Sequence, residues 1–360
     1  MKVVIIGSGI AGITLTILLK QKGFTVSIYE KGNQLPAIGH AFLVHPDAKK
    51  VIELIAALNP AIKFPGHIIQ SIILKRPDNS TIQTTMLDAW QCLKRKSIIQ
   101  YLSAFLSEED VHYNKIFSHF VYEGDKAVAA VFEDGDIVYG DVFIGADGSF
   151  SQVRKLLFGE VLFSPVEVKE IVGLIHHPLL VTKFSHVFTK YISEEKGLAF
   201  GLIPCSDEEL VWFMQFDVLL QNNNLATADE LKSFCTSMLA NFPEAVQEVL
   251  ANNNFENNYV WRSTDLDLLP SFHKGNVALV GDAAHLALPF TSAGTTNALY
   301  DAKVLSELLV KEVSLNNIFT QFYQLRSQQI KEHIGLGRAI KYNFLNTNQT
   351  EIKLPLILDL

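Results

Sequence analysis

The pattern of apolar and polar residues predicts a strand, a helix and a second strand at the start of the chain. Residues 2–6 (KVVII) form an apolar run rich in β-branched residues, which is typical of a strand buried on both faces. A helix is predicted to follow as far as Lys22, where Gly23 ends it. Residues 25–29 (TVSIY) then predict a second strand that leads to Glu30. This order favours a parallel α/β sheet.

Later apolar runs extend this picture. Residues 141–145 and 276–280 each predict a strand that runs into an acidic turn. Between residues 164 and 262, apolar runs such as 197–204 and 210–216, separated by turn residues, predict paired strands of a second sheet. A hairpin over residues 68–86 is expected to join that sheet, and residues 318–345 predict a long helix.

The glycines between the first strand and the first helix bring in chemistry. In the run 7–12 (GSGIAG), Gly7 makes a tight turn, Gly9 lets a pyrophosphate approach the backbone, and Gly12 lets the helix pack on the strand. The helix N-terminus would face the phosphates. Glu30 follows Gly12 by 18 residues, where a carboxylate can accept hydrogen bonds from a ribose. The order predicts a dinucleotide site, with an α/β turn without ligand as the alternative, and leaves open NAD or FAD.

Composition narrows the class of protein. A chain of 360 residues that is 48% hydrophobic, with a mean hydropathy of +0.20, can bury a sizeable core in about two domains. A net charge of -8 and a pI near 5.8, without a dense basic cluster, argue against nucleic acid as a partner. The three cysteines (Cys92, Cys205, Cys235) lack the spacing of metal ligands, so we expect buried thiols, no metal site and a cytoplasmic location.

The first apolar stretch also permits a membrane interpretation. Residues 3–19 carry no charge between Lys2 and Lys20. The stretch is short for a membrane span, and neither a stop-transfer pattern nor a small-residue cleavage site follows. Glycines interrupt it at the spacing of a dinucleotide motif, so we expect neither a signal peptide nor a membrane segment.

Three separated motifs choose between the cofactors. The glycine run, the turn at Asp147-Gly148 and the pair Gly281-Asp282 occur in an order that resembles the FAD-dependent monooxygenases of the aromatic-hydroxylase group. That group includes the para-hydroxybenzoate and salicylate hydroxylases and the tetracycline-inactivating monooxygenases. Of these, the chain resembles the tetracycline-inactivating monooxygenases most. The resemblance implies an α/β fold with a Rossmann-like FAD-binding domain, an inserted β-sheet substrate domain and a long C-terminal helix.

The resemblance also divides the chain. The FAD-binding domain would be discontinuous and comprise residues 1–63, 92–163 and 263–315. The substrate domain would comprise residues 64–91 and 164–262, and the C-terminal helix residues 316–346.

Cofactor roles carry over from the family onto positions that match its motifs. Asp282 would hydrogen-bond the ribityl chain of FAD, and Pro289 would pack beside the ring. The amides of Gly294 and Thr295, at a helix N-terminus, would stabilise negative charge on the reduced flavin. The full set of implied cofactor contacts is Gly7, Gly9, Ile10, Ala11, Gly12, Glu30, Lys31, Arg95, Ile116, Asp147, Gly281, Asp282, Pro289, Gly294 and Thr295.

Six positions need comment. Arg95 matches the helix-start arginine that reaches the flavin nucleotide, with a solvated basic turn as the alternative, and Ile116 lies at the strand whose backbone touches the adenine. Catalysis would centre on the flavin; the candidates beside the ring are His40, Pro289 and Phe290. His285 is expected to hold its turn through hydrogen bonds.

The loop after the last motif departs from the family pattern. The family commonly has Pro-x-x-Gly-Gln-Gly-x-Asn, whereas this chain has Ser292, Ala293 and Thr296 in place of the first glycine, the glutamine and the asparagine. We expect the backbone amides to keep their role if φ stays negative. Side-chain tuning of the flavin edge, and with it oxygen activation, is expected to differ.

The resemblance finally implies a reaction. NAD(P)H would reduce the flavin, O2 would add to give a flavin hydroperoxide, and one oxygen atom would pass to an apolar, aromatic or polyketide-like substrate. Because the one glycine-rich dinucleotide motif is given to FAD, the nicotinamide would dock transiently or a separate flavin reductase would supply electrons. The alternatives are a flavin dehydrogenase or reductase, a non-catalytic FAD-binding protein, and a halogenase, although residues 199–204 (AFGLIP) lack both tryptophans of Trp-x-Trp-x-Ile-Pro.

Overall fold

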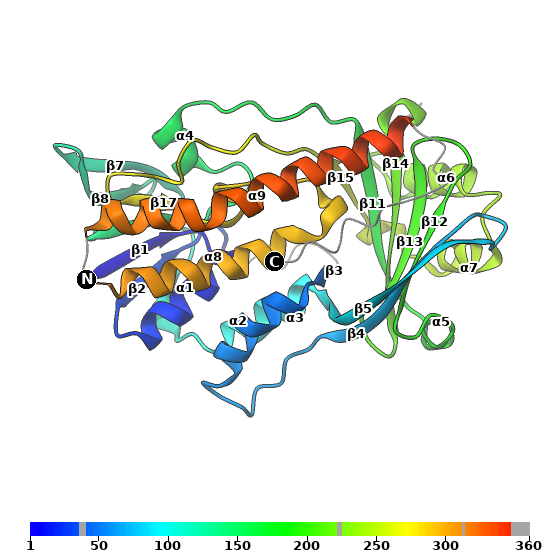
Figure 1. Cartoon of the computed structure of the whole chain (residues 1–360), viewed down its shortest axis with the longest axis horizontal. Helices are drawn as coiled ribbons and strands as arrows, with labels where there is room; N and C mark the ends of the chain where they lie inside the picture. Colours follow the sequence, from blue (N-terminus) through cyan, green and yellow to red (C-terminus); the bar gives the residue numbers. More distant parts are fainter. Residues whose placement is uncertain (36–40, 222–224, 312–313, 347–360) are drawn as a thin grey trace.

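The computed structural model describes residues 1–35, 41–221, 225–311 and 314–346. Figure 1 shows a parallel sheet with its helices at one end of the molecule and a large, mostly antiparallel sheet at the other. The long helix α9 (Leu315–Asn346) runs from the first end to the second. The predicted fold class is therefore confirmed.

The parallel sheet is built from the apolar runs that the sequence pattern indicated. Its strand order is β16 (His273–Lys274), β17 (Val277–Leu279), β10 (Val142–Gly145), β1 (Lys2–Ile6), β2 (Thr25–Tyr29) and β6 (Val111–His112). All neighbouring pairs are parallel except β16 with β17. Strands β1, β10 and β17 end at the same edge, so the three motifs that follow them meet there.

The second sheet has eight strands. Their order is β15 (Tyr259–Ser263), β11 (Val168–His176), β14 (Glu209–Asp217), β13 (Leu198–Pro204), β12 (Val187–Ile192), β4 (His67–Lys75), β5 (Thr81–Lys94) and β3 (Ala41–Val44). The pairing of β13 with β14 and the β4–β5 hairpin confirm the predicted strands. Strand β3 also joins this sheet, although residues 1–63 were expected in the FAD-binding domain.

A small third sheet was not predicted from the sequence. It consists of β7 (Phe117–Glu123), β8 (Lys126–Phe132) and β9 (Ile137–Tyr139). The buried Asn276 fastens it to the parallel sheet, because its amide donates to the carbonyls of Ala127 and Asp141 and accepts from the amide of Ala127. No periodicity in the sequence marks this role of Asn276.

Helices cover the two main sheets differently. Helices α1 (Ile10–Gln21) and α8 (Ala293–Leu309) contact each other beside the parallel sheet, and α9 packs on α8. Helices α5, α6 and α7 pack on the outer face of the eight-stranded sheet. The remaining elements are α2 (Pro46–Ala56), α3 (Arg95–Ser103), α4 (Gln152–Phe158), α5 (Pro178–Lys183), α6 (Ala228–Met238), α7 (Glu244–Asn252), and the 3-10 turns η1 (Glu108–Asp110), η2 (Val218–Leu220), η3 (Phe255–Asn257), η4 (Gly281–Ala283) and η5 (Pro289–Thr291).

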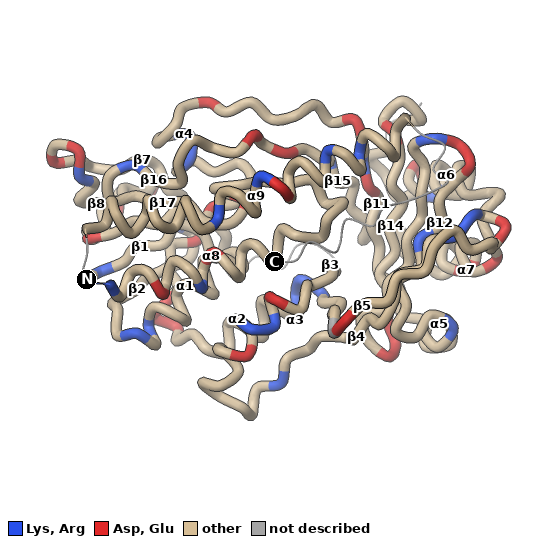
Figure 2. Tube along the Cα trace, viewed as in Figure 1, with Lys and Arg blue, Asp and Glu red and all other residues tan. Residues whose placement is uncertain are grey.

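Charged residues of both signs are mixed along the chain, and the cysteines are buried. Figure 2 shows Lys and Arg interspersed with Asp and Glu over both ends of the described chain. The three cysteines are free and buried, as predicted. Among the described residues, no helix is long and apolar enough to span a membrane.

Candidate functional site

The N-terminus of α1 presents open backbone at the edge of the parallel sheet. Gly9 is its N-cap, and no side chain caps the helix, so the first-turn amides have no intrahelical acceptor. Gly7 has φ +103, and an added Cβ would lie 2.4 Å from the Ala146 carbonyl oxygen, so the turn itself requires glycine. At Gly9 the nearest protein atom would lie 3.9 Å away. Packing does not demand glycine there, which leaves room for a ligand.

Glu30 lies beside this turn, at the end of β2, and is 7% exposed. Its Oε2 accepts hydrogen bonds from the amide (2.9 Å) and hydroxyl (2.7 Å) of Ser8, and its Oε1 accepts one from the amide of Gly32 (2.9 Å). A carboxylate offers about four acceptor positions, so capacity for a ribose hydroxyl is left. Lys31 is exposed. The orienting role of Ser8 escaped the sequence reading, because Ser8 fills a variable position of the glycine motif.

A second open helix N-terminus begins α8. Its N-cap Ser292 makes no side-chain capping bond, and an added Cβ on the exposed Gly294 would meet only the Asp282 Oδ1 atom, at 4.0 Å. The Asp282 carboxylate thus lies beside the first turn of α8. Thr295 lies in that turn, Phe290 is partly buried and Pro289 is exposed.

The condition set for this loop is not met. The backbone amides were expected to keep their role if φ stays negative, but Ser292 has φ 52. The 3-10 turn η5 closes with a hydrogen bond from the Ser292 amide to the Pro289 carbonyl (3.0 Å), and the chain then reverses into α8. That reversal requires the left-handed region, where the family has glycine and this chain has serine.

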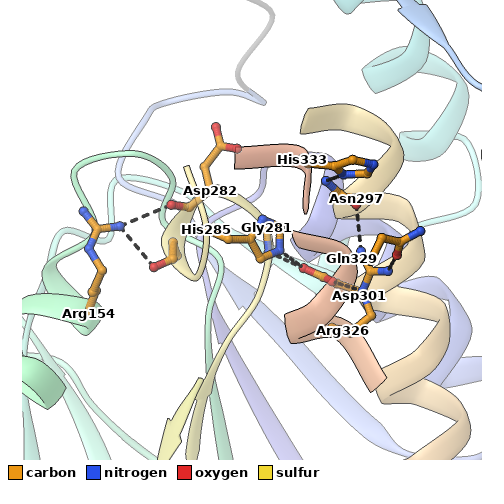
Figure 3. A network of polar contacts seen from close by, with 10 residues as sticks. Arg154, Gly281, Asp282, His285, Asn297, Asp301, Arg326, Gln329 and His333 are labelled. Carbon is orange, nitrogen blue, oxygen red and sulfur yellow. Dashed lines mark hydrogen bonds and ion pairs between the residues drawn. The ribbon is translucent and has the colours of Figure 1, made fainter. Parts of the chain in front are cut away.

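Arg95 and Asp282 form the charged part of the site. Arg95 begins α3, as predicted, and is partly buried. Burial lowers the pKa of its guanidinium, while the nearby Asp282 raises it. The structure records no hydrogen bond from Arg95 to any described residue. Figure 3 shows the Asp282 carboxylate pointing away from Arg154 and Asp301. Among the described residues, the one hydrogen bond recorded for this carboxylate is a long one from the Ser149 hydroxyl (3.4 Å).

The turn after β10 contributes mainly to the architecture of the site. The Asp147 carboxylate accepts from the Ser151 hydroxyl (2.5 Å) and the Val153 amide (3.1 Å), and burial raises its pKa. Both oxygens therefore already serve the start of α4. The predicted contact of Asp147 with a cofactor has to be made beside these bonds or by its backbone.

Arg154 is a site residue that sequence reasoning missed. It is 2% exposed and donates to the carbonyls of Asp282 (3.2 Å) and Ala283 (3.0 Å), as Figure 3 shows, and to the carbonyl of Ser149 (2.5 Å). These bonds tie the turn after β10 to the turn after β17. A lone arginine early in α4 gives no sequence signal of this role.

A buried ionic network supports the same turn from behind (Figure 3). Asp301 accepts hydrogen bonds from Gly281 (2.8 Å), His285 (2.6 Å) and Arg326 (2.8 Å). Burial raises the pKa of Asp301, but His285 and Arg326 lower it more, to about 2. The expectation that His285 holds the turn is confirmed. Asp301 and Arg326 were not foreseen, since they lie on α8 and α9, far apart in the sequence.

The remaining predicted positions are less informative. Ile116 lies one residue before β7, is exposed, and its carbonyl accepts from the Glu133 amide (2.9 Å). His40 lies outside the described residues. Thr296, one of the departures, accepts a long hydrogen bond (3.4 Å) from the amide of His45, the N-cap residue of α2. No cluster of potential metal ligands occurs within the described parts of the chain.

Comparison with known proteins identifies the family. A family model described as "FAD binding domain" matches residues 1–314. The chain belongs to this FAD-binding family. It is an FAD-dependent oxidoreductase, and its resemblance to the FAD-dependent monooxygenases is confirmed.

Individual relatives agree with this assignment. The chain is 27% identical over 348 residues to the 6-methylsalicylate 1-monooxygenase atA of Aspergillus terreus, covering 85% of this chain and 74% of that protein. Its fold is similar to that of Klebsiella pneumoniae HpxO complexed with FAD and uric acid, with a TM-score of 0.87, 20% identity and coverage of 96% and 89%. The tetracycline destructase Tet(51) has a TM-score of 0.70 at 21% identity, with coverage of 96% and 91%.

The residues present fit FAD. The N-termini of α1 and α8, which no side chain caps, and the Arg95 guanidinium, which has no recorded hydrogen bond to a described residue, suit an anionic dinucleotide. The open face of Gly9 leaves room for its pyrophosphate. The assignment of individual contacts stays a prediction.

Proposed function

We propose that this protein is a monooxygenase that uses NAD(P)H and O2 to hydroxylate an aromatic or polyketide-like small molecule. The observation that carries the proposal is the facing arrangement of the Asp282 carboxylate and the uncapped first turn of α8 at Gly294. Bound FAD would accept electrons from the nicotinamide and pass them to O2. Cytoplasmic location is part of the same proposal.

The residues of the chain would divide the work. The amides at the start of α1 would hold the pyrophosphate and Glu30 the adenosine ribose. Asp282 would hold the ribityl chain, and Arg95 would balance the phosphate charge. The amides of Gly294 and Thr295 would stabilise the negative charge that develops on the ring when it is reduced. The eight-stranded sheet would cover the substrate and keep water out.

A direct test measures O2 consumption by the FAD-loaded protein with NADH or NADPH, with and without candidate phenols, followed by product mass under ¹⁸O2. The proposal predicts that the product gains one labelled oxygen atom. Oxidation of NAD(P)H without labelled product would instead indicate the dehydrogenase or reductase alternative. The departures at Ser292, Ala293 and Thr296 keep the non-catalytic FAD-binding alternative in view, which predicts neither NAD(P)H-dependent O2 consumption nor labelled product.

Electron delivery has its own test. We expect substrate to accelerate flavin reduction several-fold, because reduced flavin exposed to O2 would waste electrons as peroxide. Stopped-flow reduction under anaerobic conditions measures this rate. No reduction by either nicotinamide would point to a separate flavin reductase as partner.

A further inference from the structure

Three polar side chains form a hydrogen-bonded row on one face of the eight-stranded sheet. The Lys190 ammonium on β12 donates to Gln215 Oε1 on β14 (2.6 Å), and Gln215 Nε2 donates to Glu170 Oε1 on β11 (2.8 Å). Strand β13 lies between β12 and β14, and its residue opposite Lys190 is Gly201. Gly201 has no side chain, and the Phe213 ring occupies that space, because an added Cβ would lie 2.1 Å from its Cζ atom. The ammonium also lies 5.7 Å from the centroid of the Phe213 ring.

This row lies on the face of the sheet that is turned away from helices α5, α6 and α7. Those helices pack on alternate strand residues such as Ile171 and Phe200. The opposite face carries Ala199, which is in register with Gln215 and clusters with Phe290 and Phe344. Phe290 follows Pro289 in the loop that leads into α8. The row therefore shares its face with residues that touch the loop of the candidate flavin site.

The charges of Lys190 and Glu170 offset the cost of burying each other only in part. Burial lowers the pKa of Lys190 to about 8, although Glu170 raises it. Burial raises the pKa of Glu170, although Lys190 and Gln215 lower it. Within the described parts of the chain, Gln215 is the one hydrogen-bond acceptor recorded for the Lys190 ammonium. An ammonium has further donors, so a ligand oxygen could bind there without breaking the row.

We propose that Lys190 determines specificity by binding an acidic oxygen of the substrate, such as a phenolate, an enolate or a carboxylate. Gln215 is a positioning residue, because its amide fixes Lys190 against Glu170. Glu170 disfavours a second negative charge on the substrate. This assignment rests on the proposed function and narrows it from apolar aromatic molecules to aromatic molecules that carry one acidic oxygen.

Equilibrium dialysis of the FAD-loaded protein against salicylate and, separately, against neutral 2-methoxybenzamide tests the proposal without turnover. We expect the parent to prefer salicylate. Lys190→Met should weaken salicylate binding about tenfold or more, the effect of losing a charge-assisted hydrogen bond, and should change amide binding by less than about twofold. Lys190→Arg should retain the preference. Lys169→Met is the matched control, because Lys169 lies on the other face of β11 and donates to Gln221.

Glu170→Gln is predicted to change salicylate affinity in the opposite direction to Lys190→Met. If the three residues had only a structural role, this opposite effect would not be expected. Removal of the Glu170 negative charge should tighten salicylate binding several-fold, and this variant decides the matter if Lys190→Met fails to fold. Weaker or unchanged salicylate binding in Glu170→Gln, or a parent that does not prefer salicylate to the amide, would overturn the proposal. Salicylate preference without oxygen transfer in the ¹⁸O2 experiment would overturn the proposed function alone.

Discussion

The two open helix N-termini resemble each other in geometry and differ in what holds them. At α1, the preceding turn is built by glycine at φ +103 against the Ala146 carbonyl, and the buried Glu30 braces it through Ser8. At α8, the preceding residue is Ser292 at φ 52, and the buried Asp301 within α8 holds the neighbouring turn after β17 through Gly281 and His285. The nucleotide end is thus fixed by backbone packing, and the ring end by a strained serine and a buried ionic network.

The largest effect should come from Gly7→Ala. Because the added Cβ would lie 2.4 Å from the Ala146 oxygen at an unfavourable φ, we expect a loss of about 3 kcal/mol or more of unfolding free energy in urea. The control is Gly23→Ala, where φ is +83 but nothing lies within 4 Å of the added Cβ, and we expect about 1 kcal/mol. Equal losses would show that packing does not fix the α1 turn.

This contrast also explains which parts of the molecule could be predicted from sequence. The α1 turn was predictable because glycines, strand and acid lie within about thirty residues and act locally. Arg154, Asp301 and Arg326 were not, because each contacts a segment that only the tertiary fold brings near: the turn after β17 for Arg154 and Asp301, and helix α8 for Arg326. The left-handed Ser292 was missed because serine rarely adopts that conformation.

Acidic pH should lower the unfolding free energy by protonating Asp301 on α8. The pKa of Asp301 is lowered from 3.8 to about 2 in the folded protein, so its contribution is present above pH 4 and is lost as pH falls through about 2. We expect the parent to lose about 2 kcal/mol more than Asp301→Asn between pH 5 and pH 2. Urea unfolding at both pH values measures this difference. Identical pH dependence in the two proteins would remove Asp301 from the account.

Substitutions of the two acidic residues of the site, Glu30 and Asp282, should distinguish an effect on folding from an effect on FAD binding. Glu30→Gln and Asp282→Asn should each weaken FAD by about 1.5 to 3 kcal/mol, as measured by fluorescence titration. Only Glu30→Gln should also lower the unfolding free energy of the apoprotein, because Glu30 accepts three hydrogen bonds from the chain. Asp267→Asn, at an exposed carboxylate, is the control. Unchanged FAD affinity in Asp282→Asn would exclude that carboxylate from the site.

The smallest effect concerns the strained serine. Ser292→Gly should raise the unfolding free energy by about 0.5 kcal/mol, because relief of left-handed strain exceeds the added freedom of the unfolded chain. The control Asn79→Gly, at φ 69, should gain less, because asparagine tolerates this region. Chemical denaturation of both variants checks this order, and a destabilised Ser292→Gly would contradict the strain assigned to the loop.

The account's central claim is that FAD binds with its pyrophosphate against the open backbone at Gly9. The most direct measurement is FAD titration of Gly9→Val beside Gly335→Val, a matched change in α9. An added Cβ would meet nothing within 4 Å at Gly335 and only the Ala146 oxygen, at 3.9 Å, at Gly9. Circular dichroism and urea unfolding verify that both variants fold. The account predicts that Gly9→Val folds like the parent but retains no FAD, whereas Gly335→Val binds FAD normally. A folded Gly9→Val protein that binds FAD with the affinity of the parent would contradict it.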